Sequence, residues 1–454
     1  MYYFTGTTKE GKTMSDNHEE KNIPLAAEGN EQAFSNSEDE YEAKITADGG
    51  VILTRYKGNA ENVVIPAVWE GRPVVGLLET FNGNDEIKSV VIPDSVTAIG
   101  GHTFFDCGSL VYVTIPDSVT AIDEMAFESC SSLSSITIPD SVTHIGTFAF
   151  YGCRSLTSII IPSGVTAIGE EAFYGCSSLT SINVDENNSF YKFVNGVLFT
   201  KDGKALIAYP NGIKGDYSIP DGVTHIGSYA FCGCSSLTAV TIPDSVTEIG
   251  EGAFSKCSGL TSVTIPDSVT IIGKVAFSGC YNLISVTIPD SVTAIGEGAF
   301  AGCYSLASVT IPASMTAIDN YVFSDCRSLK SVTIPASVVT IGDGAFFRCP
   351  KLTSVTIPDS VTAIGVWAFK NCKKLTVICP KNSFAWQYCK VEVNRLRRKP
   401  LKTVTPNTVA APAKTKSHRW LIPLILALAL LAGGAAVQLL GIFDILGWLV
   451  GLLG

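Results

Sequence analysis

The sequence predicts an α/β repeat protein, an elongated solenoid rather than a set of globular domains. Ile-Pro pairs recur in steps of 23 residues, and other apolar residues recur at fixed offsets from them. A unit of 23 residues buries too few large side chains to offset its ordering entropy, so the units must stack and fold together. The pairs begin at Ile92, Ile115, Ile138 and Ile161, then at Ile219, Ile242, Ile265, Ile288, Ile311, Ile334 and Ile357.

Each repeat begins with a predicted strand. In the stretch from Leu283 to Ile288, apolar and polar residues alternate, which is the pattern of a strand buried on one face. Pro289 has no N–H to continue the ladder, and the Asp and Ser that follow it favour a turn. Val292 and Ile295 then face inward on a second, shorter strand.

The rest of the repeat is predicted to be one helical turn. Gly296 is expected at a positive φ, because Asp123 and Asp319 replace it elsewhere and Asp tolerates that conformation. The following E-G-A-F-A-G-C segment is too short for a full helix, and we expect it to direct Phe300 and Cys303 into the core.

The repeat pattern resembles the BspA-like leucine-rich repeat, also called the Treponema-type repeat. The residues that carry this resemblance are L-x-x-V-x-I-P-x-x-V-x-x-I-G-x-x-A-F-x-x-C, in about a dozen copies across residues 44–390. It implies a right-handed leucine-rich-repeat solenoid and a family often found on microbial surfaces and in adhesion. The motif consists of fold residues, so the resemblance implies no catalytic residues. We therefore expect no enzyme and no cofactor.

The chain divides into segments by composition and repeat register. A hairpin turning at Asp48-Gly49-Gly50 is expected at the start of the N-terminal cap, which shields the first coil's open strand edge. A coil that carries a β-hairpin is expected where the repeat register breaks. The predicted segments are an acidic disordered tail (1–43), the N-terminal cap (44–91), the repeats (92–374) with the irregular hairpin-bearing coil (184–218), and a capping helix in a C-terminal cap (375–390), where Phe384 or Trp386 covers the last coil.

The C-terminal residues predict a membrane anchor. A basic linker rich in Pro and Thr covers 391–419, and 420–443 is an apolar segment long enough to span a bilayer as a helix. A short apolar tail, 444–454, follows. Because the basic residues precede the span, the repeat domain is expected to face the cytoplasm, with cell-surface exposure as the alternative.

Charge and cysteine usage exclude several kinds of site. The net charge is −10 and the repeat region is acidic, so no nucleic-acid partner is expected. Eleven of the 14 cysteines occupy the same repeat position, which favours a ladder of buried thiols over disulfides or a metal site. The Asp after each Ile-Pro pair is expected to form a local Asx turn rather than a Ca²⁺ ladder.

The outward strand positions form a regular Ser/Thr face, expected to be the concave face of the solenoid. Plain β-propensity explains much of this composition, but a hydroxyl-lined face can also hold a protein or glycan partner. Residues that interrupt the pattern, and two aromatic residues of the irregular coil, are the candidates for partner binding. These candidates are Tyr112, Ile160, Asn183, Lys330, Tyr191 and Tyr209. The alternative function is a structural spacer or surface-layer element without a specific ligand.

Overall fold

The protein forms a solenoid in which each coil has three sides. The structure, a computed structural model, describes residues 36–389. The predicted right-handed repeat solenoid is confirmed, with about 14 coils of roughly 23 residues. Its three sides are a first strand ladder, a second ladder of shorter strands, and a series of turns that we name the turn ladder.

The first ladder contains the predicted alternating strands. Its strands pair in parallel at the repeat period, so that Ser285 aligns with Ser262 and Val286 with Val263. The valines are buried and the flanking Ser and Thr side chains point outward, as the period-two pattern predicts. The strands are β3 (Asn62–Val64), β6 (Ser89–Val91), β8 (Tyr112–Thr114), β11 (Ser158–Ile161), β13 (Ser181–Val184), β17 (Gly215–Ser218), β19 (Leu237–Thr241), β21 (Ser262–Thr264), β23 (Ser285–Thr287), β26 (Ser331–Thr333), β28 (Ser354–Thr356) and β30 (Thr376–Ile378).

The second ladder is made mostly of two-residue strands that pair in parallel and whose Ile is buried or half-buried. The exception is β4, which has no Ile and pairs antiparallel with β5. In the N-terminal half its strands are β1 (Tyr41–Ile45), β2 (Val51–Tyr56), β4 (Val68–Trp69), β5 (Arg72–Leu77), β7 (Ala98–Ile99), β9 (Ala121–Ile122), β10 (His144–Ile145) and β12 (Ala167–Ile168). In the C-terminal half they are β14 (Tyr191–Val194), β15 (Val197–Thr200), β16 (Ala205–Ala208), β18 (His225–Ile226), β20 (Glu248–Ile249), β22 (Ile271–Ile272), β24 (Ala294–Ile295), β25 (Ala317–Ile318), β27 (Thr340–Ile341) and β29 (Ala363–Ile364).

Both ends of the described solenoid are covered. At the N-terminal end a 3₁₀ turn, η1 (Glu38–Glu40), leads into β1, and β1 and β2 form the predicted antiparallel hairpin. At the other end residues 384–389 are helical. Trp386 and Tyr388 pack against the core, whereas Phe384 is 45% exposed, so Trp386 rather than Phe384 covers the last coil.

The prediction of one helical turn per repeat is wrong. Phe277 donates its N–H to the carbonyl of Ala299 in the next coil at 2.7 Å, and Val275 and Gly279 pair with the next coil in the same way. The intervening residues close turns within their own coil, as Cys280 does with Phe277. Alternate N–H groups therefore point along the solenoid axis, which an α-helix does not allow.

The expected role of the repeat glycine is also wrong. Gly296 does not have a positive φ; the residue two positions later, Gly298, does, at 63°. A Cβ on Gly296 would lie 2.5 Å from the backbone nitrogen of Lys274 in the preceding coil. The absence of a Cβ on Gly296 therefore lets these two coils approach closely. Asp123 and Asp319 stand at this position without a positive φ.

The core is a column of stacked aromatic rings lined by thiols. Phe277 and Phe300 lie parallel with ring centroids 5.2 Å apart, and the same stacking repeats along the solenoid. The 14 cysteines are free and buried, and eleven of them form the predicted ladder of buried thiols. Their thiols also donate hydrogen bonds, since the Sγ of Cys303 lies 3.3 Å from the carbonyl of Phe277. Burial raises the pKa of Cys280 to about 12, which keeps that thiol protonated near neutral pH.

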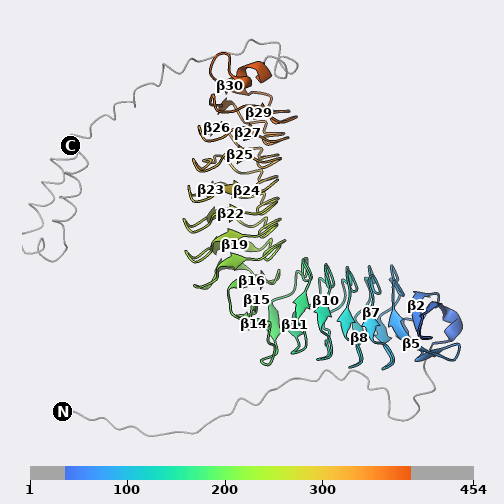
Figure 1. The fold of residues 1–454 in the computed structure, drawn as a ribbon. Helices are drawn as coiled ribbons and strands as arrows, with labels where there is room; N and C mark the ends of the chain where they lie inside the picture. Colours follow the sequence, from blue (N-terminus) through green and yellow to red (C-terminus); the bar gives the residue numbers. More distant parts are fainter. Residues whose placement is uncertain (1–35, 390–454) are drawn as a thin grey trace, which may run out of the picture.

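The solenoid bends where the repeat register breaks. Figure 1 shows an N-terminal arm in blue and cyan and a C-terminal arm in green to orange, meeting at β14, β15 and β16. Both strand ladders are interrupted there, because β12 ends one sheet and β14 begins the next, and β13 does not pair with β17. The buried residues likewise form two clusters, which meet at Val197 and Leu198. We call this junction the elbow.

The predicted membrane localisation is corrected by the structure. Between residues 36 and 389 no helix has the length and apolar character needed to cross a bilayer. The single-pass assignment and the cytoplasmic orientation derived from it are therefore not supported. The predicted disordered tail (1–43) is wrong for residues 36–43, which include η1 and the beginning of β1. The rest of that tail, the linker (391–419), the span (420–443) and the apolar tail (444–454) lie outside the described residues.

Candidate functional site

The candidate residues on the first ladder lie on its outward face but do not form one cluster. Tyr112 on β8 is 41% exposed and Ile160 on β11 is 60% exposed. Ile160 and Asn183 are direct cross-strand partners, so these two residues are neighbours. Lys330 is exposed in the C-terminal arm, on the far side of the elbow from the other three.

The two aromatic candidates of the irregular coil differ in accessibility. Tyr191 is half-buried, and its hydroxyl donates a hydrogen bond to the carbonyl of Thr166 at 3.4 Å. Tyr209 is only 4% exposed and stacks on Phe231 with ring centroids 4.9 Å apart. Tyr209 takes the place of a core phenylalanine, so its assignment to partner contact is corrected.

Two of the aspartates after the Ile-Pro pairs form hydrogen bonds to the next coil. A carboxylate oxygen of Asp290 accepts the N–H of Ala313 at 2.9 Å, and one of Asp140 accepts the N–H of Ser163 at 3.2 Å. In both pairs the next coil has lost its own Asp. At these two positions the carboxylate accepts from the next coil, where a local Asx turn was expected. Within residues 36–389 no cluster of three His, Cys, Asp or Glu residues is placed to hold a metal ion.

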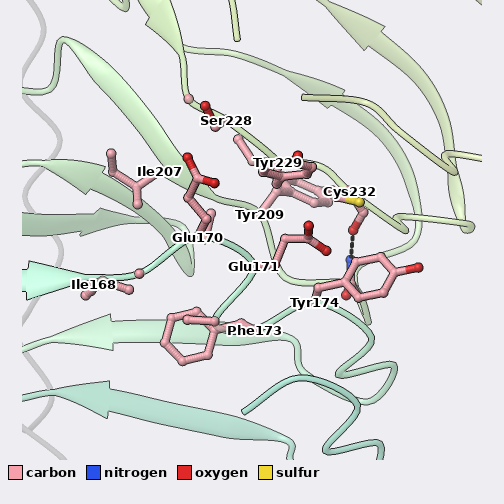
Figure 2. A pocket seen from close by; sticks show the side chains of 16 residues that line it. Ile168, Glu170, Glu171, Phe173, Tyr174, Ile207, Tyr209, Ser228, Tyr229 and Cys232 are labelled. Carbon is pink, nitrogen blue, oxygen red and sulfur yellow. Dashed lines mark hydrogen bonds between the residues drawn. The ribbon is translucent and has the colours of Figure 1, made fainter. Parts of the chain in front are cut away.

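The elbow contains a cavity of about 190 Å³, which we call the elbow pocket. Its first wall is the turn ladder of the Phe173 coil and its second wall is that of the Phe231 coil (Figure 2). Ile207, Ala208 and Tyr209, from the coil between these two, also line it. Figure 2 shows Glu170 and Glu171 on the first wall and Ser228 and Tyr229 on the second.

The pocket exists because one coil is too short. In the coil of Phe231, the core ring follows Ile226 by five positions. In the preceding coil, which we call the elbow coil, the core ring of Tyr209 follows Leu206 by only three. Both ends of the short segment keep their normal pairing, since Leu206 accepts the N–H of Gly227 and Tyr209 donates to Ala230. Two residues of turn ladder are therefore missing between the two walls.

Asn211 replaces part of the missing backbone with its side chain. Its Oδ1 accepts the N–H of Gly175 at 2.6 Å, and its Nδ2 donates to the carbonyl of Cys232 at 2.8 Å. In regular coils a backbone carbonyl accepts a hydrogen bond from the preceding coil, and the next N–H along the chain donates one to the following coil. The Asn211 amide performs both functions while 8% exposed.

Three other backbone groups on the two walls have no hydrogen-bond partner among the described residues. The N–H groups of Glu171 and Phe173 donate no hydrogen bond, although the equivalent groups of Phe148 and Phe150 donate to the next coil. On the opposite wall the carbonyl of Ser228 accepts none, whereas the equivalent carbonyl of Glu251 accepts the N–H of Tyr229. The pocket is therefore lined by two donors facing one acceptor.

The elbow pocket is predominantly acidic. Burial raises the pKa of Glu171, while Lys256 opposes this effect and Glu170 adds to it. Lys256 lies 5.0 Å from the centre of the Tyr174 ring, and its pKa is raised by a hydrogen bond to that side chain. The Tyr229 hydroxyl donates to Glu251 at 3.1 Å. Glu170 and Glu171 form no ion pair within 36–389.

The sequence contained a signal for this pocket that the repeat pattern alone did not reveal. Aligning L-I-A-Y from Leu206 with I-G-S-Y-A-F from Ile226 exposes the two-residue deletion. The deletion lies inside an insertion, so only the pairing of Gly227 and Ala230 shows which residues correspond. Asn211, Glu170 and Glu171 were not among the predicted site residues for that reason.

These features define a repeat solenoid of the leucine-rich class, with an interrupted turn ladder at its elbow. The chain belongs to the family described as the BspA type leucine rich repeat region, whose model matches six copies at residues 78–195, 214–329 and 247–376. This confirms the resemblance noted in the sequence. A comparison with curated proteins finds no match.

Solved structures of bacterial leucine-rich repeat proteins share the fold. One from Bacteroides ovatus is 28% identical, with a TM-score of 0.51, over 78% of this chain and 97% of that one. One from Eubacterium ventriosum is 27% identical, with a TM-score of 0.58, over 73% of this chain and 92% of that one. The pneumococcal vaccine antigen PcpA is 20% identical, with a TM-score of 0.56, over 80% of this chain and 96% of that one, which shows the fold alone.

Proposed function

We propose that this protein is a binding scaffold that holds a protein or glycan partner on the outward face of its first strand ladder. The observation that supports this best is the exposure of Tyr112 and Ile160 on that face, at 41% and 60%, among small hydroxyl side chains. Large apolar side chains on a regular polar face provide contact area that β-propensity does not require. Membership of a leucine-rich repeat family agrees with an interaction role.

The test compares capture by the full chain with capture by two variants. Tyr112→Ser combined with Ile160→Thr removes the apolar surface while keeping strand-compatible residues. Val366→Thr, at an exposed position on the turn ladder, serves as the matched control. We expect the double variant to capture at least tenfold less partner from protein and glycan arrays than the full chain. The control should capture as much as the full chain.

The competing function is a spacer that projects another part of the molecule. A spacer predicts no reproducible capture by the full chain, or capture that the double variant leaves unchanged. Either result would remove the first-ladder face from consideration as a binding surface. No described residue supports a catalytic function.

A further inference from the structure

We propose that the elbow pocket binds an extended peptide segment of a partner protein that carries an Arg or Lys side chain. This binding site is separate from the first-ladder face and does not depend on it. The pocket is formed by the turn ladder of both arms, and the missing two residues define what it accepts.

The first argument is the pattern of backbone donors and acceptors. Elsewhere in the described coils, the N–H groups equivalent to those of Glu171 and Phe173 pair with a neighbouring peptide backbone, except in the last coil, which has no successor. Phe173 is 6% exposed, so its free N–H lies where an unpaired donor is costly. A peptide segment that presents two carbonyls to these donors and one N–H to Ser228 reproduces the bonds of a regular coil.

This pattern also fixes the direction of the bound segment. In regular coils two kinds of backbone group alternate along the turn ladder: carbonyls that accept from the preceding coil and N–H groups that donate to the following coil. Successive coils run parallel to each other. The bound segment must therefore run parallel to residues 226–231. Addition of a peptide strand to open backbone edges is an established mode of recognition, in which side-chain contacts supply the specificity.

The second argument is charge. Glu170 is exposed and Glu171 is half-buried on the first wall, and neither is neutralised by an ion pair within the described residues. The nearby Lys256 is held over the Tyr174 ring. A guanidinium or ammonium group on the bound segment would form charge-assisted hydrogen bonds with these carboxylates, whereas an acidic segment would be repelled.

The experiment titrates the full chain with a fluorescein-labelled hexapeptide, Gly-Thr-Arg-Arg-Thr-Gly, and follows fluorescence anisotropy. We expect saturable binding, no binding of the Gly-Thr-Glu-Glu-Thr-Gly peptide, and slower hydrogen exchange at Glu171 and Phe173 when the basic peptide is bound. Glu170→Gln with Glu171→Gln should weaken binding about tenfold or more, the effect of losing one charge-assisted bond.

The matched control is Glu297→Gln, because Glu297 occupies the position of Glu170 in a coil without a pocket. It should bind the basic peptide like the unmodified chain. A peptide methylated on the backbone nitrogens of both arginines keeps its charge but cannot donate a hydrogen bond to the carbonyl of Ser228. It should bind several-fold more weakly. Equal binding of the methylated peptide, equal binding by the Glu170 and Glu171 variant, or no binding at all would each overturn the proposal.

These outcomes are independent of the first-ladder proposal. The Tyr112→Ser and Ile160→Thr variant leaves the pocket intact, so it should bind the basic peptide normally even if its other capture is lost. Loss of peptide binding in that variant would show that the pocket is not the site.

Discussion

At the residue scale, the repeat uses glycine for two different physical reasons. Gly296 lies against the backbone of the preceding coil, where any Cβ would be about 2.5 Å from Lys274 N. Gly298 has a positive φ of 63°, but its nearest foreign atom is a Val275 side-chain carbon at 3.3 Å. Tyr321 and Trp367 occupy the same left-handed position in other coils. Close packing therefore requires glycine more strictly than the left-handed conformation does.

Substitutions at these two glycines should have opposite outcomes. Gly296→Ala forces two coil backbones apart and should destabilise the protein by about 2 kcal/mol or more, within the range of overpacked sites. Gly298→Asn should change stability by about 0.5 kcal/mol or less, because Asn tolerates a positive φ. Urea unfolding of both variants checks this. A larger loss in Gly298→Asn would mean that the left-handed backbone is the stricter constraint.

At the element scale, strands were predictable and the turn ladder was not. Alternation of apolar and polar residues from Leu283 to Ile288 reports burial directly, so the strands and their buried valines followed from the sequence. The E-G-A-F-A-G-C segment has no such signature, because its N–H groups pair with another coil 22 residues away. That pairing is tertiary, and local propensity does not encode it.

The elbow coil depends on the Asn211 side chain in the same tertiary way. Asn211→Leu keeps the approximate shape but leaves the Gly175 N–H and the Cys232 carbonyl without their partner. We expect a loss of about 2 kcal/mol, since each unsatisfied group costs about 1–3 kcal/mol and water in the adjacent pocket can relieve part of it.

The control for Asn211 is Asn187→Leu, at an exposed position whose side chain makes no hydrogen bond within the described residues. Its urea midpoint should match that of the unmodified chain. If Asn211→Leu also matched it, the Asn211 amide would not be acting as a substitute peptide unit.

At the scale of the whole molecule, the elbow divides one repeat array into two packing units. Stacked coils stabilise one another through nearest-neighbour contacts, so coupling along a solenoid depends on unbroken ladders. Both strand ladders are interrupted at the elbow, as they also are between β23 and β26 and between β24 and β25. Only at the elbow, near Val197 and Leu198, do the buried residues of the described coils also divide into two clusters. The stacked repeats therefore bury two hydrophobic interiors that meet at the elbow.

Two core substitutions, one in each arm, test whether the arms unfold separately. Phe300→Ala removes a ring stacked on Phe277 and Phe323, and Phe127→Ala removes one stacked on Phe104 and Phe150. Each should cost about 3–5 kcal/mol in its own arm. Hydrogen exchange followed by mass spectrometry should then show faster exchange in the C-terminal arm only for Phe300→Ala, and in the N-terminal arm only for Phe127→Ala. If either substitution accelerated exchange equally in both arms, the elbow would transmit stability as a regular coil does, and the chain would be a single cooperative unit despite its interrupted ladders.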